Sequence, residues 1–198
     1  MAEELLRKFS DRTTVKHEQD YPFVEAATYA DDTKYIGGGW QSNWHFDDIA
    51  FVGDDSQASN YTFPQNDHNI SLAMPYIFRF LQGEELNGTY IVDTIMKYAN
   101  TTEEGRSIAL RLLIHYMGDS HQPFHCGTRF TKNFTEGDKG GNSFTLKNHY
   151  SAESLHAVWD EGIYAFHESL PRPFDNSTWE TLGELAANLS SQVKVTKS

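Results

Sequence analysis

The fold is decided by the stretch HYMGDSHQPFH at residues 115–125, which ends an apolar helical pattern and carries three histidines and an aspartate. A second stretch, LHAVWD, occupies residues 155–160. Each contains a His-x-x-x-Asp pair, and residues four apart lie on one face of a helix. An imidazole and a carboxylate that point to the same place are typical zinc ligands. Two such pairs, with a further histidine just after a helix-breaking proline, indicate a helical protein that holds a cluster of metals.

The composition is that of a globular chain. The chain has 198 residues, of which 38% are hydrophobic and 14% aromatic, and a chain of this length buries roughly 70% of its unfolded surface. No apolar run approaches the ~20 residues that span a bilayer. The net charge of −12, without a Lys/Arg block, argues against a sequence-reading DNA-binding protein, which needs a basic footprint. An enzyme that contacts phosphates through metal ions is not excluded, because a zinc ion inverts the local field.

The remaining pattern predicts a single, mainly helical (all-α) domain over residues 1–198. We expect helices over residues 3–29, 69–80, 89–99, 101–118 and 151–166. Asn69 and Thr101 are the expected N-caps of two of these helices, and Pro75 is expected to kink or shorten the helix that contains it. The Gly-rich residues 128–148 are expected to form a long polar excursion with a short hairpin at 143–146.

Glycosylation acceptors are a second strong signal. Seven of the eleven asparagines lie in Asn-x-Ser/Thr triplets, at Asn60, Asn69, Asn87, Asn100, Asn133, Asn176 and Asn188. This density favours N-glycosylation, and hence a secreted, lysosomal or vacuolar location, over coincidence in a Thr-rich chain. We also expect a monomer. The single Cys126 is either a free thiol or has a partner outside this chain.

Taken singly, the acidic and imidazole side chains have ordinary explanations. A lone His115–Asp119 pair at a helix end is more often a buried histidine with a capping aspartate than a metal site. His125 follows Pro123 at once, however, and His156 with Asp160 repeats the pattern on another helix. Four ligands from two helices and one from a bend are more than coincidence usually supplies.

Five motifs in order along residues 26–160 resemble a known family. They are Tyr29-Ala30-Asp31, His45-Phe46-x-Asp48, the 115–125 stretch, Gly140-Gly141-Asn142 and Leu155-His156-x-x-Trp159-Asp160. The chain is similar to the zinc-dependent, single-strand-specific nucleases of fungi and plants (nuclease type I), which belong with the helical, three-zinc phospholipase C enzymes. The resemblance implies the same helical fold.

The resemblance also implies a set of metal ligands. One zinc would take Asp31, His45, His115 and Asp119, and a second would take His125, His156 and Asp160. In the family a third zinc, bridged by the carboxylate equivalent to Asp119, is held by an N-terminal Trp and a nearby His. No such opening precedes the first predicted helix, and His17 is the only histidine upstream of Asp31. We therefore expect two complete zinc sites, an incomplete third site, and a chain that is truncated at both ends.

The remaining site residues are also implied by the resemblance. Asp48 matches the water-orienting catalytic base, and Lys34 a cation that steadies the transition state. Phe46 and Asn142 match the positions that bind the base of the substrate. Without the family context, Lys34 is an exposed cation, Phe46 a core residue and Asn142 a turn residue.

The implied function is that of a zinc-dependent endonuclease that hydrolyses single-stranded RNA and DNA and has 3′-nucleotidase activity, with single-stranded nucleic acid and nucleotides as partners. Zinc ions can supply both a nucleophile near neutral pH and charge neutralisation at a phosphodiester. One alternative is a phospholipase C-like phosphodiesterase that uses the same metal core. Another is an inactive, truncated member that retains structural zinc.

Overall fold

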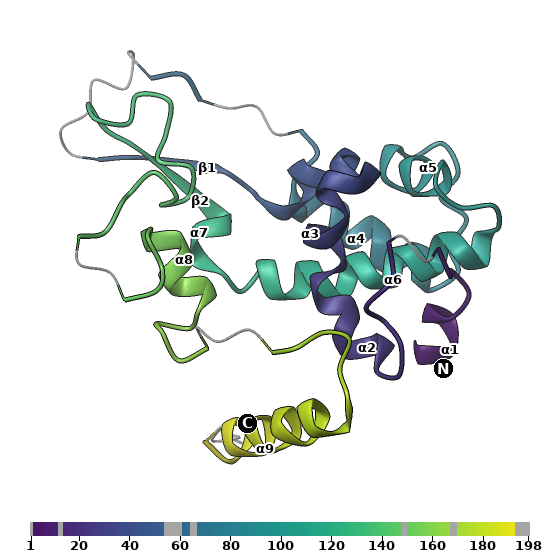
Figure 1. Ribbon diagram of the computed structural model, residues 1–198. Helices are drawn as coiled ribbons and strands as arrows, with labels where there is room; N and C mark the ends of the chain where they lie inside the picture. Colours follow the sequence, from purple (N-terminus) through teal and green to yellow (C-terminus); the bar gives the residue numbers. More distant parts are fainter. Residues whose placement is uncertain are drawn as a thin grey trace, which may run out of the picture.

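The computed structural model describes residues 2–11, 14–53, 61–63, 67–147, 150–166 and 170–192. Its central element is α6 (Thr102–Asp119), which contacts the helices α1 (Ala2–Leu6), α3 (Tyr29–Thr33), α4 (Ile70–Leu81) and α5 (Tyr90–Met96) (Figure 1). The helix begins as predicted, because the Thr101 side chain accepts a hydrogen bond from the backbone N–H of Glu104. The expected mainly helical fold is confirmed.

The hydrophobic core lies where α4 (Ile70–Leu81) and α5 (Tyr90–Met96) pack on α6. Asn69 caps α4, as expected, by accepting a hydrogen bond from Leu72 N–H. Pro75 lies within the first two turns of α4 and does not shorten the helix, which ends at Leu81. Among the helices of the described ranges, none is both long and apolar enough to cross a lipid bilayer.

The N-terminal third differs from the prediction of helix over residues 3–29. The helix α1 (Ala2–Leu6) is short, and the next helical segments are α2 (Pro22–Glu25), the 3₁₀ helix η1 (Ala26–Thr28) and α3 (Tyr29–Thr33). The buried guanidinium of Arg111 donates hydrogen bonds to the carbonyl oxygens of Leu6 and Phe9. These are carbonyls that a longer α1 would use for its own hydrogen bonds, so the helix stops at Leu6.

Residues 34–48 form a curved connection from α3 to the only described strands. Most of it is helical: η2 (Lys34–Gly38) is followed directly by the 3₁₀ helix η3 (Gly39–His45). The strand β1 (Ile49–Val52) then pairs in parallel with β2 (Gly127–Phe130), so that Ile49 lies opposite Gly127. This pairing brings the residues just before β1 next to the short helix α7 (Pro123–Cys126), which leads into β2.

The helix predicted over residues 151–166 is confined to α8 (Leu155–Asp160), which Ser154 caps. The helix ends there because Gly162, Ile163 and Tyr164 all have positive φ. The expected hairpin at 143–146 is instead an antiparallel pairing of residues 144–146 with residues 153–155. Asn60 and His149 lie outside the described residues.

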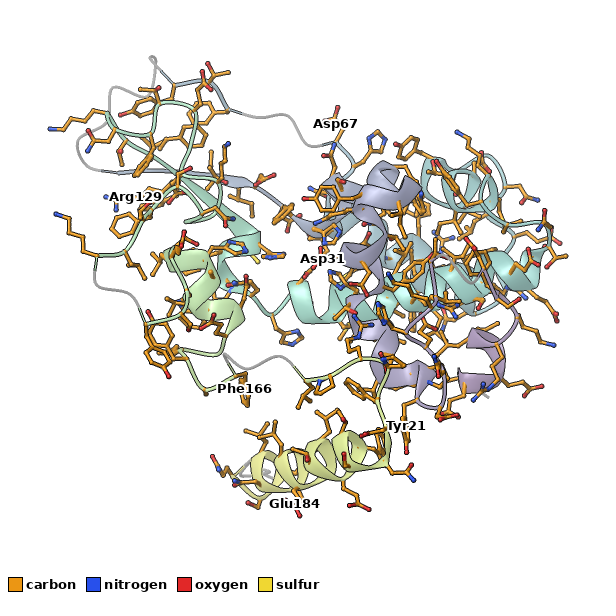
Figure 2. The ribbon with its side chains drawn as sticks, viewed as in Figure 1. Tyr21, Asp31, Asp67, Arg129, Phe166 and Glu184 are labelled. Carbon is orange, nitrogen blue, oxygen red and sulfur yellow. The ribbon has the colours of Figure 1, made fainter. Side chains whose placement is uncertain are left out.

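The last helix, α9 (Asn176–Gln192), lies beside the body of the molecule and touches it near its first turn (Figures 1 and 2). Trp179 stacks on Tyr21, and the Tyr21 hydroxyl donates a hydrogen bond to Asn176. Ahead of α9, Arg172 forms ion pairs with the buried Glu25 and with Asp32. These contacts fix the chain on α2 and α3.

Candidate metal centre

The seven predicted metal ligands come from five elements that meet at one end of α6. Figure 2 shows Asp31 on α3, directed toward the region where α6, α7 and α8 come together. The contributions are Asp31 from α3, His45 from the end of η3, His115 and Asp119 from the last turn of α6, His125 from α7, and His156 and Asp160 from α8. The structure thus brings together side chains that are up to 129 positions apart in the sequence, from position 31 to position 160.

The first group has the spacing of a tetrahedral site. His45 Nδ1 lies 3.2 Å from His115 Nε2, and Asp119 Oδ2 lies 2.8 Å from the former and 3.2 Å from the latter. The Asp31 carboxylate completes the group at 3.9 Å from His45 Nδ1 and 3.7 Å from His115 Nε2. Ligands bound at 2.0–2.1 Å in a tetrahedron lie about 3.3 Å apart. The measured spacings scatter around this value. Asp31, His45 and His115 therefore form a group that could hold a zinc ion, and Asp119 lies beside both histidines.

The second group consists of His125, His156 and Asp160, whose ligand atoms lie within 4.8 Å of one another. His156 Nε2 is 3.6 Å from Asp160 Oδ2, four residues away on α8. The rings of His125 and His156 stack with centroids 4.9 Å apart. Gln122 Nε2 donates a 2.6 Å hydrogen bond to Asp160 Oδ1 and so leaves the other carboxylate oxygen toward the histidines. Three ligands with an open fourth position are typical of catalytic zinc sites.

Asp119 connects the two groups. Its Oδ2 atom faces His45 and His115, while its Oδ1 atom lies 3.6 Å from His125 Nδ1. The two groups are therefore neighbours. His121, in contrast, is exposed, with its Nδ1 atom 2.6 Å from the Met117 carbonyl oxygen, and belongs to neither group.

Main-chain carbonyl oxygens orient three of the four histidines. The Nδ1 atoms of His115, His125 and His156 lie 2.6, 3.0 and 2.7 Å from the carbonyl oxygens of Ala27, His45 and Gly140. A carbonyl oxygen can only accept, so each Nδ1 carries a proton, and Nε2 is the ring nitrogen left to face the centre. This is the arrangement that metal-ligating histidines use.

The electrostatics of the first group also suit a metal. Burial alone would raise the pKa of Asp119, but hydrogen bonds with His115 and His45 outweigh burial and hold its pKa well below the usual range. Burial lowers the pKa of His45 and of His125, although contact with Asp119 opposes it. Asp119 is therefore ionised and these two imidazoles are neutral near pH 7, the states that metal binding requires. His115 behaves differently, because its bond and charge interaction with Asp119 outweigh burial and raise its pKa.

Lys34 and Phe46 lie beside the first group. Lys34 Nζ forms a 2.8 Å ion pair with Asp31, and the pair outweighs burial to lower the pKa of Asp31. The same ammonium lies 5.9 Å from the centroid of the Phe46 ring. The Phe46 ring in turn packs against His125, with centroids 4.6 Å apart. Phe46 is half-buried at the margin of the centre rather than part of the main core.

Asp48 lies directly before β1, and Asn142 lies in a turn. Asp48 has a φ of +53°, a left-handed conformation that is uncommon for residues other than glycine, and its carboxylate accepts a 3.1 Å hydrogen bond from the buried Thr128 hydroxyl. Asn142 is exposed, and its side chain donates to the carbonyl oxygen of Lys139. No measured distance joins Asn142 to the metal ligands.

Several residues that shape this centre were missing from the sequence prediction. Gln122, Thr128 and Gly140 contact predicted site residues, as does Gln41, whose side chain lies 2.7 Å from His45. Gln122 lies inside the ligand-rich stretch, and Gln41 lies four residues before His45 in a helical segment, so position alone could have drawn attention to both. Nothing in the sequence separates Thr128 from the other threonines. His17 belongs to neither group of potential ligands among the described residues.

Comparisons with known proteins agree with this geometry. The family model described as S1/P1 nuclease matches residues 1–198. Endonuclease 4 of Arabidopsis thaliana is 28% identical over 178 residues, which cover 87% of this chain and 52% of that protein. Endonuclease 3 of the same plant is 33% identical over 112 residues, covering 51% of this chain and 35% of that protein. Endonuclease 1 is 46% identical over 55 residues, covering 28% and 16%.

The chain spans about half the length of Endonuclease 4, the relative that it matches over most of its own residues. The family model covers the segment that carries all five motifs and both groups of ligands, and the resemblance noted in the sequence is therefore confirmed. The chain belongs to the S1/P1 nuclease family.

Proposed function

We propose that this protein is a zinc-dependent endonuclease that hydrolyses phosphodiester bonds in single-stranded RNA and DNA and also removes 3′-phosphates from nucleotides. One observation carries the proposal. Two groups of acidic and imidazole side chains lie side by side with Asp119 between them, and main-chain carbonyl oxygens bind the outward ring nitrogen of three of the four histidines. The first group would hold one zinc ion, and the second group would hold another. When bound, zinc supplies Lewis acidity and lowers the pKa of water.

The chain's own residues would position the reacting groups. The Asp48 carboxylate, held by Thr128, is the proposed base that orients the attacking water. The Lys34 ammonium, beside Asp31, would offset negative charge that develops on the phosphoryl oxygens. Asp48 in its left-handed conformation is a strained residue, and strain of this kind is common in catalytic residues.

The preference for single strands would follow from access to the centre. The ligating histidines are buried, so a phosphodiester can approach them only when its nucleotide is unstacked. Phe46, at the margin beside His125, offers an aromatic face for the base. Asn142 is the proposed polar contact to the edge of the base, for which its side chain would exchange the bond to Lys139.

A secreted or vacuolar, N-glycosylated monomer is the cellular form we propose. The acceptors Asn87, Asn100, Asn133, Asn176 and Asn188 are exposed, as glycan attachment requires. Asn69 is half-buried, and its side-chain oxygen caps α4. Mass spectrometry of protein from a eukaryotic secretory host would test this point, and unmodified Asn87 and Asn133 would contradict it.

Elemental analysis combined with cleavage assays tests the enzymatic proposal. We expect about two zinc ions per chain, and cleavage of a single-stranded oligonucleotide in preference to its duplex. Asp48→Asn should abolish turnover and leave the zinc content unchanged, whereas His156→Ala should remove one zinc. Zinc lost from Asp48→Asn would show that Asp48 is a ligand. Wild-type protein that holds zinc but cleaves neither substrate would favour a purely structural role of the metals.

A further inference from the structure

Gln41 is the least accessible polar side chain around the metal centre. Its exposed fraction is 0%, and its amide makes three hydrogen-bond contacts of 2.7 Å each. The partners are the Ala30 carbonyl oxygen, the Tyr116 hydroxyl and His45 Nε2. Tyr116 is also fully buried. Bulk solvent therefore does not reach this network.

The Ala30 carbonyl oxygen fixes the orientation of the Gln41 amide. The Gln41 Nε2 atom lies 2.7 Å from this oxygen, to which it must donate. Turning the amide over would place two acceptor oxygens 2.7 Å apart in a buried site, which is strongly unfavourable. The Gln41 Oε1 atom must therefore face Tyr116 and His45, and it can only accept from them.

This orientation determines which nitrogen of His45 is free. Because Oε1 only accepts, His45 Nε2 carries a proton and cannot bind a metal ion. Nδ1, which lies 2.8 Å from Asp119 Oδ2 and also faces Asp31 and His115, is then the ring nitrogen available to a metal ion. In the other three histidines, Nδ1 donates a hydrogen bond to a main-chain carbonyl oxygen, and Nε2 faces the centre. His45 is thus the single ligand in the described centre whose ring is oriented by a side chain and whose Nδ1 faces the metal position.

We propose that Gln41 is a positioning residue that sets the tautomer of His45 and thereby the zinc affinity of the first group, without touching metal or substrate. This inference rests on the proposed zinc site, but it concerns metal affinity and not turnover. Removing such an outer partner typically weakens metal binding 10–100-fold. Because the second group obtains none of its hydrogen bonds from Gln41, its affinity should not change.

The test is zinc titration of the full chain against a chromophoric chelator, with no substrate present. We expect the wild-type protein to show two binding events, and Gln41→Leu to weaken one of them 10–100-fold while the other is unchanged. Tyr116→Phe serves as a matched control inside the same network. It removes one donor, but Ala30 still orients the amide, so its zinc affinity should stay within a few-fold of the wild type.

Gln41→Glu separates the hydrogen bond from mere packing. A protonated Glu reproduces the donor and acceptor pattern of Gln, because its hydroxyl donates to the Ala30 carbonyl oxygen while its other oxygen accepts from His45. Burial beside the Ala30 carbonyl oxygen favours this protonated form, so first-site affinity should be retained. This variant decides the question if Gln41→Leu does not fold by circular dichroism. Equal weakening of both sites in Gln41→Leu, no weakening at all, or a tenfold loss in Gln41→Glu would each overturn the inference. A wild-type protein that binds no zinc would instead overturn the proposed function itself.

Discussion

Gly140→Ala should damage the second metal group through the backbone alone. Gly140 has a φ of +59°, and a Cβ atom at this position would overlap the carbonyl oxygen of Phe124. Its own carbonyl oxygen lies 2.7 Å from His156 Nδ1 and fixes the tautomer of that ring. An alanine cannot occupy this site unless the turn moves, and a moved turn loses its contact with His156.

The expected magnitude has two parts. The left-handed conformation costs about 1–2 kcal/mol for a residue with a Cβ atom, and relief of the overlap with Phe124 adds to this value. Loss of the carbonyl partner of His156 should weaken zinc binding at the second group by about 10–100-fold, which corresponds to about 1.4–2.8 kcal/mol. The variant should therefore be less stable and should also hold its second zinc weakly.

Two measurements check this expectation: urea denaturation of the zinc-free protein and zinc titration of the folded protein. Gly183→Ala, in the exposed middle of α9, is the matched control, since a Cβ there meets no atom within 4 Å. It should raise stability by about 0.5–1 kcal/mol and leave zinc binding unchanged. If Gly140→Ala keeps wild-type stability and both zinc affinities, the turn at Gly140 does not orient His156 and the reasoning is refuted.

Three further outcomes follow from single hydrogen bonds. Thr128→Val removes the hydrogen-bond donor to Asp48, so kcat for single-strand cleavage should fall about tenfold or more with zinc content unchanged. Thr128→Ser keeps the hydroxyl and should restore kcat. An unaffected kcat in Thr128→Val would show that Asp48 does not need this hydrogen bond. Thr101→Ala should lower the free energy of unfolding by about 1 kcal/mol, measured in urea, unless other contacts hold the start of α6. The hydrogen bond from Thr178 N–H is the main cause that lowers the pKa of Asp175 to about 2, so this carboxylate contributes stability in full above its ordinary pKa of 3.8 and loses that contribution as the pH falls toward 2. An NMR titration that places the pKa of Asp175 near 3.8 would contradict this assignment.

The parts of the fold governed by local signals could be predicted from the sequence. The caps at Asn69 and Thr101 mark two helices because each side chain acts on its own next turn. The end of α1 could not be predicted, because it depends on Arg111, about a hundred residues away, taking the carbonyl oxygen of Leu6. The left-handed turn that ends α8 was also missed, since Ile163 is not a residue that signals positive φ.

In the candidate site, too, some residues could be predicted from the sequence and others could not. Candidate ligands could be proposed because metal binding restricts residue types, and the His-x-x-x-Asp spacing places both donors on one helical face. The partners that orient those ligands act through space and are less restricted in type. Gln41 and Thr128 are ordinary polar residues in the sequence, and their importance depends on a buried partner supplied by another element. The sequence therefore indicates candidate metal ligands more readily than the residues that orient them.

The use of main-chain oxygens to hold His115, His125 and His156 has a consequence for mutational scanning. Every amino acid has a main-chain carbonyl group, whatever its side chain. The carbonyl oxygen of Ala27 lies 2.6 Å from His115 Nδ1, and the Ala27 side chain is exposed. Ala27 should therefore accept most replacements without loss of activity. Such a scan would score Ala27 as dispensable although its oxygen aligns a metal ligand. Tolerance to substitution would here reflect a role that every amino acid can fill, and only changes in the course of the backbone, such as a proline or a deletion, would reveal it.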